Sequence, residues 1–162
     1  MKVVTNNVKE TQEVGRKMGQ IIKDTSLDLD HAFVISLEGD LGGGKTSFMQ
    51  GFAQGLDLDE KILSPTFIIC RKCKLSESSF QYLYHCDYYR LDPEENKEVG
   101  FQDIFSNSQN LVVVEWGNKI KSMLPKLSLV IKFDFKEKDK RSINIIDPFK
   151  IFDSINNESV KS

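Results

Sequence analysis

The chain has 162 residues, of which 40% are hydrophobic, and this is enough to bury one substantial core. Its formal net charge of -2 excludes a global basic field, so tight autonomous binding to a nucleic-acid backbone is not expected. The stretch "MKVVTNNVKE" lacks the apolar core of a signal peptide, and no apolar stretch approaches the length of a membrane span. We therefore expect one domain over residues 1–150, a frayed tail over residues 151–162, and a soluble cytoplasmic protein with no membrane partner.

The first third of the chain predicts a helix, a strand, a loop and a second helix, in that order. Apolar residues recur at helical spacing between Lys9 and Lys23, which indicates an amphipathic helix. The apolar run "AFVISLE" predicts a buried strand, and a glycine-rich loop follows it. A second helix is expected from Thr46 to Leu56.

The rest of the chain predicts mainly strands, because β-branched and aromatic residues are frequent in it. Strands are expected over residues 66–75, 80–89, 111–115, 127–135 and 141–146. The first two should pair antiparallel, and the last two should form a hairpin around the charged turn "KEKDK". A short acidic helix is expected over residues 92–105, with Pro93 near its start.

The three cysteines are Cys70, Cys73 and Cys86. An odd number without a secretion signal argues against a disulfide framework. Cys70 and Cys73 form a C-x-x-C, and the pair His85–Cys86 could add ligands for zinc. On a strand, however, residues three apart point to opposite faces, so we expect buried or incidental cysteines instead.

The segment "GDLGGGKTS" carries the chemistry, because Gly39, Gly44, Lys45 and Thr46 satisfy the phosphate-loop pattern G-x-x-x-x-G-K-[ST]. Glycines let backbone N–H groups converge on an anion, and the helix that follows directs its positive end to the same point. Lys45 would neutralise the outer phosphates, and the Thr46 hydroxyl would bind magnesium. The other loop residues expected to contact nucleotide are Asp40, Leu41, Gly42 and Gly43. The alternative is a flexible glycine turn with a solvated lysine.

A magnesium site also needs a carboxylate near Thr46, and Glu115 at the end of "LVVVE" is the best candidate. The alternative for Glu115 is an exposed strand end. Asp87 in "HCDYYR" is the second candidate, either as a contact of metal or water or as an ion-pair partner of Arg90.

In "SPTF", Pro65 stiffens the loop and would present the Thr66 hydroxyl in a fixed direction. In a nucleotide-driven switch such a hydroxyl senses the γ-phosphate, and the alternative is a loop cap.

Together these segments resemble the TsaE (also called YjeE) family of P-loop ATPases, which serve bacterial biosynthesis of the tRNA modification threonylcarbamoyladenosine. The likeness runs from Thr11 to Trp116 and rests on the ordered motifs "LEGDLGGGKTSF", "SPTF", "HCDYYRL", "VGFQDIF" and "VVVEWG". The chain departs from the family pattern at Gly43, where alanine is common, and at Gly117, where proline is frequent. The expected fold is α/β and P-loop NTPase-like, with three layers and a central, mostly parallel sheet extended by antiparallel strands.

The resemblance implies a magnesium-dependent ATPase, with ATP and Mg²⁺ as its cofactors, that acts on a complex of TsaB and TsaD and reaches tRNA only indirectly. It makes Lys45, Thr66 and Asp87 the catalytic candidates. It makes Thr46 and Glu115 magnesium ligands. It also places Trp116 near the nucleotide and Thr11 beside the base or ribose.

The main rival is a small-molecule or nucleoside kinase of the P-loop class, because a phosphate loop alone does not distinguish transfer to water from transfer to a substrate. Four arginines and no visible arginine-bearing lid argue against a kinase. A third hypothesis is a nucleotide-gated scaffold with negligible hydrolysis, which a phosphate-release assay with and without partner proteins would distinguish.

Overall fold

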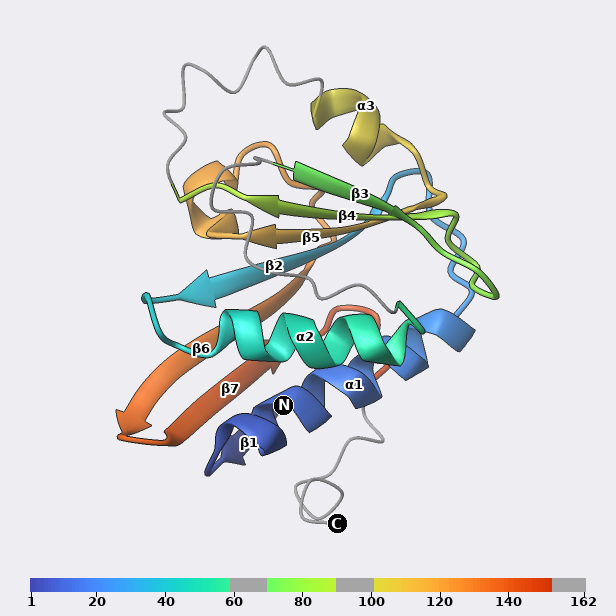
Figure 1. Cartoon of the computed structure of the whole chain (residues 1–162). Helices are drawn as coiled ribbons and strands as arrows, with labels where there is room; N and C mark the ends of the chain where they lie inside the picture. Colours follow the sequence, from blue (N-terminus) through green and yellow to red (C-terminus); the bar gives the residue numbers. More distant parts are fainter. Residues whose placement is uncertain (59–69, 90–100, 153–162) are drawn as a thin grey trace.

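The computed structural model describes residues 1–58, 70–89 and 101–152 (Figure 1). Its helices in chain order are α1 (Val8–Asp24), α2 (Lys45–Gly55), α3 (Phe101–Ser106) and the 3-10 helix η2 (Gly117–Ile120). Its strands are β1 (Lys2–Thr5), β2 (Phe33–Gly39), β3 (Cys70–Lys74), β4 (Tyr82–Asp87), β5 (Asn110–Glu115), β6 (Leu129–Glu137) and β7 (Lys140–Ile146).

The strands form one sheet with the order β1-β7-β6-β2-β5-β4-β3. The four central strands, β6, β2, β5 and β4, run parallel to one another, whereas β3 at one edge and β7 and β1 at the other are added by antiparallel pairing. The expected α/β fold, a parallel centre extended by antiparallel strands, is confirmed. Because β5 lies beside β2 and runs parallel to it, the C-terminal ends of these two strands lie next to each other.

Helices cover both faces of the sheet. We call the face under α1 and α2 the helix face; there Phe33, Ile35 and Leu37 of β2 pack in one core with apolar residues of both helices. Val34 of β2 points the other way and packs in a second core with residues of α3 and η2. The alternation along β2 follows from strand geometry, and since both faces are covered, apolar residues of this strand are buried on both sides.

Helices α1 and α2 lie side by side in Figure 1 and touch backbone to backbone. A Cβ added at Gly51 of α2 would lie 1.8 Å from the carbonyl oxygen of Gln12 in α1. Only glycine permits this approach, so the position of α1 fixes the position of α2 and of the loop that precedes it.

The predicted helices and strands of the described segments are present, with two additions. The edge strand β1 and the short helix η2 were not predicted, because four residues are too few for a periodic pattern. Residues 66–69 of the strand expected over 66–75 and residues 92–100 of the expected acidic helix lie outside the described residues. The core extends to Phe152, two positions past residue 150, while the frayed tail stays a prediction because residues 153–162 are not described.

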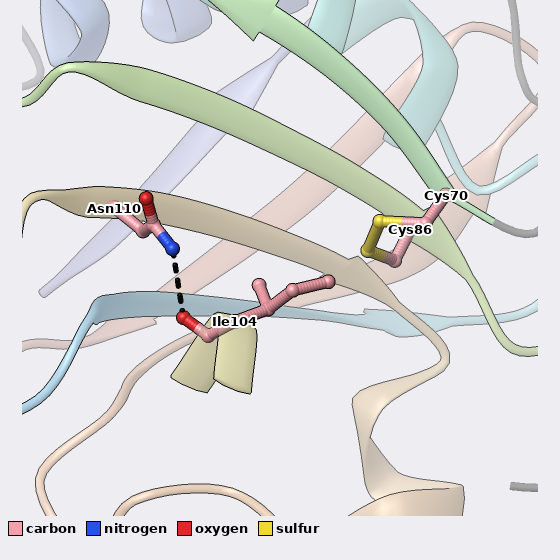
Figure 2. Close-up of a disulfide and its surroundings, with 4 residues drawn as sticks. All are labelled: Cys70, Cys86, Ile104 and Asn110. Atoms are coloured by element: carbon pink, nitrogen blue, oxygen red, sulfur yellow. Dashed lines mark hydrogen bonds between the residues drawn. A yellow bond between two sulfur atoms is a disulfide. The ribbon is translucent and has the colours of Figure 1, made fainter. Parts of the chain in front are cut away.

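The expectation of no disulfide is wrong, because Cys70 and Cys86 are bonded to each other (Figure 2). They lie directly opposite in the antiparallel pairing of β3 with β4, with a Cα–Cα distance of 4.0 Å. An odd number of cysteines does not exclude a bond between the two that strand pairing brings together. Cys73 is buried in the core of the helix face, whereas Cys70 packs against the core of the opposite face. In the described residues, no helix is both long enough and apolar enough to cross a membrane.

Candidate functional site

The glycine loop connects the end of β2 to the first residue of α2. Gly44 is the N-cap of α2 at φ 108°, and no hydrogen bond from a described side chain caps the helix there. A left-handed conformation of this kind favours glycine. The N–H groups of the first helical turn are therefore left to an external acceptor, and together with the helix dipole they make the loop suitable for a phosphate.

Lys45, the first residue of α2, is folded back into the loop and is only 5% exposed. Its ammonium group donates to the carbonyl oxygens of Gly39 at 2.6 Å and Asp40 at 2.9 Å. Burial lowers the pKa of Lys45, and the nearby charges of Glu115, Asp87 and Asp40 oppose that shift. The alternative of a solvated lysine on a flexible turn does not describe this side chain. Lys45 holds a desolvated positive charge at the loop, where a polyphosphate would compensate it.

Two carboxylates lie at the ends of the neighbouring strands. Asp87 ends β4 and lies opposite Glu115, which ends β5 and lies opposite Leu37 of β2. Glu115 follows Val113 at the spacing of two that keeps side chains on one face, and Val113 packs in the core of the helix face. Both carboxylates therefore belong to the same side of the sheet as the loop and α2.

The two carboxylates differ in environment. Glu115 is 3% exposed, so the alternative of an exposed strand end is excluded. Asp87 is half-buried, and burial raises its pKa although its Oδ1 accepts a hydrogen bond from the N–H of Tyr89 at 2.9 Å. The negative charge of Glu115 raises the pKa of Asp87 further, while the positive charge of Lys45 lowers it. A carboxylate with a raised pKa close to a buried lysine is typical of a functional site.

His85 is part of this group, although its sequence pattern indicated only a possible zinc ligand. Its Nε2 lies 2.9 Å from Oε1 of Glu115, and the imidazole is 1% exposed. The spacing of His85 and Asp87 indicates that both lie on one face of their strand, but their position beside Glu115 follows only from the pairing of β4 with β5.

The other side of the loop is formed by α1 and the β6–β7 hairpin. Thr11 is 2% exposed, and its hydroxyl lies 2.8 Å from that of Thr5. Its methyl group would lie 3.6 Å from a Cβ at Gly44. Arg141 of β7, which the sequence did not single out, donates from Nη2 to the carbonyl oxygen of Gly42 at 3.2 Å. Its guanidinium also lies over the ring of Phe135, 4.7 Å from the centroid.

Trp116 lies next to Lys45 rather than far from it. The backbone N–H of Trp116 donates to the carbonyl oxygen of Leu37 at 2.9 Å, which fixes the chain after β5 against the end of β2. The ammonium group of Lys45 lies 4.3 Å from the centroid of the Trp116 ring, a cation–π distance. The ring of Tyr89 packs against it at 4.9 Å.

The remaining predicted site residues are placed as follows. Thr46 is exposed in the first turn of α2, and Leu41 is 70% exposed at the tip of the loop. Gly43 is buried, and its N–H donates to the carbonyl oxygen of Asp40 at 3.1 Å. Thr66 and Arg90 lie outside the described residues, so the switch role of Thr66 and the ion pair of Asp87 stay predictions.

Comparisons with known proteins agree on one family. The family described as "Threonylcarbamoyl adenosine biosynthesis protein TsaE" matches residues 5–143. The TsaE protein of Haemophilus influenzae is 32% identical over 133 residues, which cover 82% of this chain and 80% of that protein. The TsaE protein of Treponema pallidum is 30% identical over 146 residues, covering 90% of this chain and 99% of that one.

A solved structure agrees with these relatives. The crystal structure of Bacillus subtilis YdiB matches with a TM-score of 0.66 and 29% identity, over 90% of this chain and 83% of that one. The matched residues contain the loop, both carboxylates and most of the sheet. The chain belongs to the TsaE family of threonylcarbamoyladenosine biosynthesis proteins.

Proposed function

We propose that this protein is a magnesium-dependent ATPase that acts on a complex of TsaB and TsaD homologues in the cytoplasm and reaches tRNA only through that complex. The observation that carries the proposal is the buried Lys45 ammonium at the uncapped N-terminus of α2. A desolvated cation and free helical N–H groups at one point suit a polyphosphate. The family name supports the place in tRNA modification.

Each residue of the site has a role in this proposal. The Lys45 ammonium contacts the carbonyl oxygens of Gly39 and Asp40 in this structure. The β- and γ-phosphates of ATP would replace these oxygens as its hydrogen-bond acceptors. Thr11 and Arg141 border the loop on the other side, where the nucleoside would lie. Asp87, with its pKa raised by burial, would orient the attacking water and accept its proton.

The oxygen donors present fit a magnesium ion. A hydroxyl and a carboxylate are the protein ligands that Mg²⁺ prefers when phosphates and water complete its shell. Thr46 in the first turn of α2 and Glu115 at the end of β5 would hold it. When bound, the ion supplies neutralisation of the phosphate charge that develops during transfer.

The test is a phosphate-release assay with and without purified TsaB and TsaD homologues, on the parent and on Lys45→Ala. Release should be slow alone, faster with the partners, and reduced about 100-fold or more in the variant, because a charge that stabilises the transferring group is lost. Equal rates in parent and variant would overturn the assignment of the loop. Transfer of the phosphate to a small molecule instead of water would indicate the kinase.

Coupling to the partners needs its own measurement. If Thr66 senses the γ-phosphate, a non-hydrolysable ATP analogue should favour partner binding over ADP, since a ligand shifts an equilibrium only by its differential affinity for two states. Equal partner affinity with the analogue, with ADP and without nucleotide would refute this coupling while leaving the ATPase in place.

A further inference from the structure

His85 and Glu115 form a buried pair in the site. The proposed function gives a role to Glu115 but none to His85. The two residues lie on the neighbouring strands β4 and β5, and their side chains are 1% and 4% exposed. Nε2 of His85 lies 2.9 Å from Oε1 of Glu115. A hydrogen bond so well shielded from water holds the carboxylate in one orientation.

The surroundings of the imidazole assign its tautomer. Nδ1 of His85 is buried and has no hydrogen-bond partner among the described residues. A proton on Nδ1 alone would turn the lone pair of Nε2 toward Oε1 of Glu115, and an ionised carboxylate oxygen has no proton to donate. A proton on Nε2 is instead donated to Oε1 of Glu115, and Nδ1 is left as a bare lone pair. The imidazole is thus the Nε2–H tautomer, and one oxygen of Glu115 is occupied by it.

We propose that His85 is a positioning residue for the magnesium site: its Nε2–H fixes Oε1 of Glu115 so that Oε2 is the oxygen that binds the ion. This inference rests on the proposed function, in which Glu115 is a magnesium ligand. Carboxylates that ligate metals are themselves held by hydrogen bonds, and loss of such a partner reduces metal affinity about 10- to 100-fold. His85 approaches the metal ligand from β4, while Lys45 contacts the carbonyl oxygens of the loop.

Two substitutions separate a positioning role from a packing role. His85→Leu keeps an apolar volume but removes the donor, whereas His85→Gln keeps an N–H at the reach of Nε2. Asn110→Leu is a matched control, because Asn110 is also buried on β5 and its Nδ2 donates to the carbonyl oxygen of Ile104 at 3.0 Å (Figure 2). Asn110 lies at the opposite end of β5 from Glu115, so its substitution removes a part-buried hydrogen bond without touching the site.

The measurement is the Mg²⁺ concentration that gives half-maximal phosphate release, together with ADP affinity in EDTA. His85→Leu should raise that concentration about 10-fold or more and leave ADP affinity in EDTA within about twofold. His85→Gln should bring the half-maximal Mg²⁺ concentration most of the way back to that of the parent, and Asn110→Leu should give the same concentration as the parent. Superimposed magnesium titrations of His85→Leu and the parent would overturn the proposal, as would an equal loss of ADP affinity in EDTA or a failure of His85→Gln to improve on His85→Leu.

Two further observations keep the inference testable if His85→Leu does not fold. Long-range ¹H–¹⁵N correlation spectra of the parent should show the Nε2–H tautomer of His85, and the Nδ1–H tautomer would overturn the proposal. The magnesium titration is then made on His85→Gln alone. We expect a half-maximal Mg²⁺ concentration near that of the parent, and a 10-fold rise would overturn the proposal. If the parent itself binds ADP equally with and without magnesium, the metal site of the proposed function fails, and this inference fails with it.

Discussion

The two halves of the site are built in different ways. The phosphate side is one continuous segment, in which Lys45 contacts carbonyl oxygens five and six residues before it. The carboxylate side joins His85 and Asp87 of β4 to Glu115 of β5, and the hydrogen bond between His85 and Glu115 spans 30 residues. A slip of β4 by one residue would turn His85 and Asp87 to the opposite face, whereas the loop would keep its chemistry. The phosphate side thus depends on local conformation and the carboxylate side on strand register.

The two halves also differ in charge, and each compensates the other. Burial lowers the pKa of Lys45 and raises the pKa of Asp87, so in both cases burial disfavours the charged form. The negative charges of Glu115 and Asp87 favour the charged form of Lys45 in return. Breaking one half should therefore leave the other half in place but without its electrostatic partner.

The largest expected effect separates the two carboxylates. Asp87→Asn should lower the turnover number about 100-fold or more with little change in the half-maximal Mg²⁺ concentration, because it removes a base and not a ligand. Glu115→Gln should raise that concentration and leave magnesium-free ADP binding close to the parent, because only the charge is lost.

Phosphate-release assays over a magnesium series, with calorimetry in EDTA, measure both effects. If Glu115→Gln and the parent give the same magnesium curve, Asp87 becomes the preferred ligand. If both variants lose ADP affinity in EDTA, the carboxylate side contributes to ADP binding without magnesium, and the two halves are not independent.

The disulfide offers a way to weaken the carboxylate side alone. The bond between Cys70 and Cys86 closes a loop of sequence separation 16 and ties β4 to the edge strand β3. Closing a loop of this size stabilises a fold by about 3 kcal/mol when the native geometry is unstrained. Reductant should therefore lower the free energy of unfolding by about 2–3 kcal/mol.

Denaturant unfolding with and without reductant measures this loss, and Cys70→Ala with Cys86→Ala is the control that should not respond to reductant. Hydrogen exchange should become faster in β3 and β4 and stay unchanged in β2 and α2. Faster exchange in all four elements would show that the two halves are not independent.

A smaller effect is expected at Arg141 of β7, which contacts the phosphate side from outside its segment. Arg141→Met removes the hydrogen bond to the carbonyl oxygen of Gly42 and should weaken ADP binding about 3- to 10-fold, the free energy of one such bond. Lys140→Met is the matched control, since it removes one positive charge from the preceding position, where Lys140 pairs with Glu137. Calorimetry on both variants decides the point. Equal losses would mean that net charge matters and the contact with the loop does not.

The same division explains what the sequence could predict. The loop and α2 could be predicted because both depend on neighbours in the chain: Gly44 adopts a conformation that favours glycine, and Lys45 starts the helix. Asp87 and Glu115 lie opposite each other because of the register of β4 against β5. The sequence predicts where each strand ends, but it does not predict this register. The wrong expectation for Cys70 and Cys86 has the same origin, since the disulfide depends on cross-strand pairing.

His85 and Arg141 were missed for related reasons. A histidine inside an apolar strand has no local signal for its partner, and that of His85 is 30 residues away. Arg141 follows a charged hairpin turn in which its side chain cannot be distinguished from its neighbours, and its contact with Gly42 spans 99 residues. A resemblance to a family places motif residues, whereas contacts between motifs need the fold.

The smallest expected effect is optical and reports on the contact between the two halves, made by Lys45 of the phosphate side and by Trp116, which directly follows Glu115 of the carboxylate side. Trp116 is the only tryptophan of the chain, and the Lys45 ammonium lies 4.3 Å from its ring centroid. If phosphates draw the ammonium away, the cation–π contact is lost and the intrinsic emission should change on addition of ADP or ATP with magnesium. Lys45→Met should alter the emission before nucleotide is added and reduce the change in emission on nucleotide binding.

Lys119→Met is the control, because Lys119 lies farther from the ring, at 5.7 Å, and donates to the carbonyl oxygen of Tyr89. Its response to nucleotide should match the parent. Saturated binding by calorimetry with an unchanged emission spectrum would show that Lys45 keeps its place over Trp116, and that the nucleotide does not act on the contact between the halves.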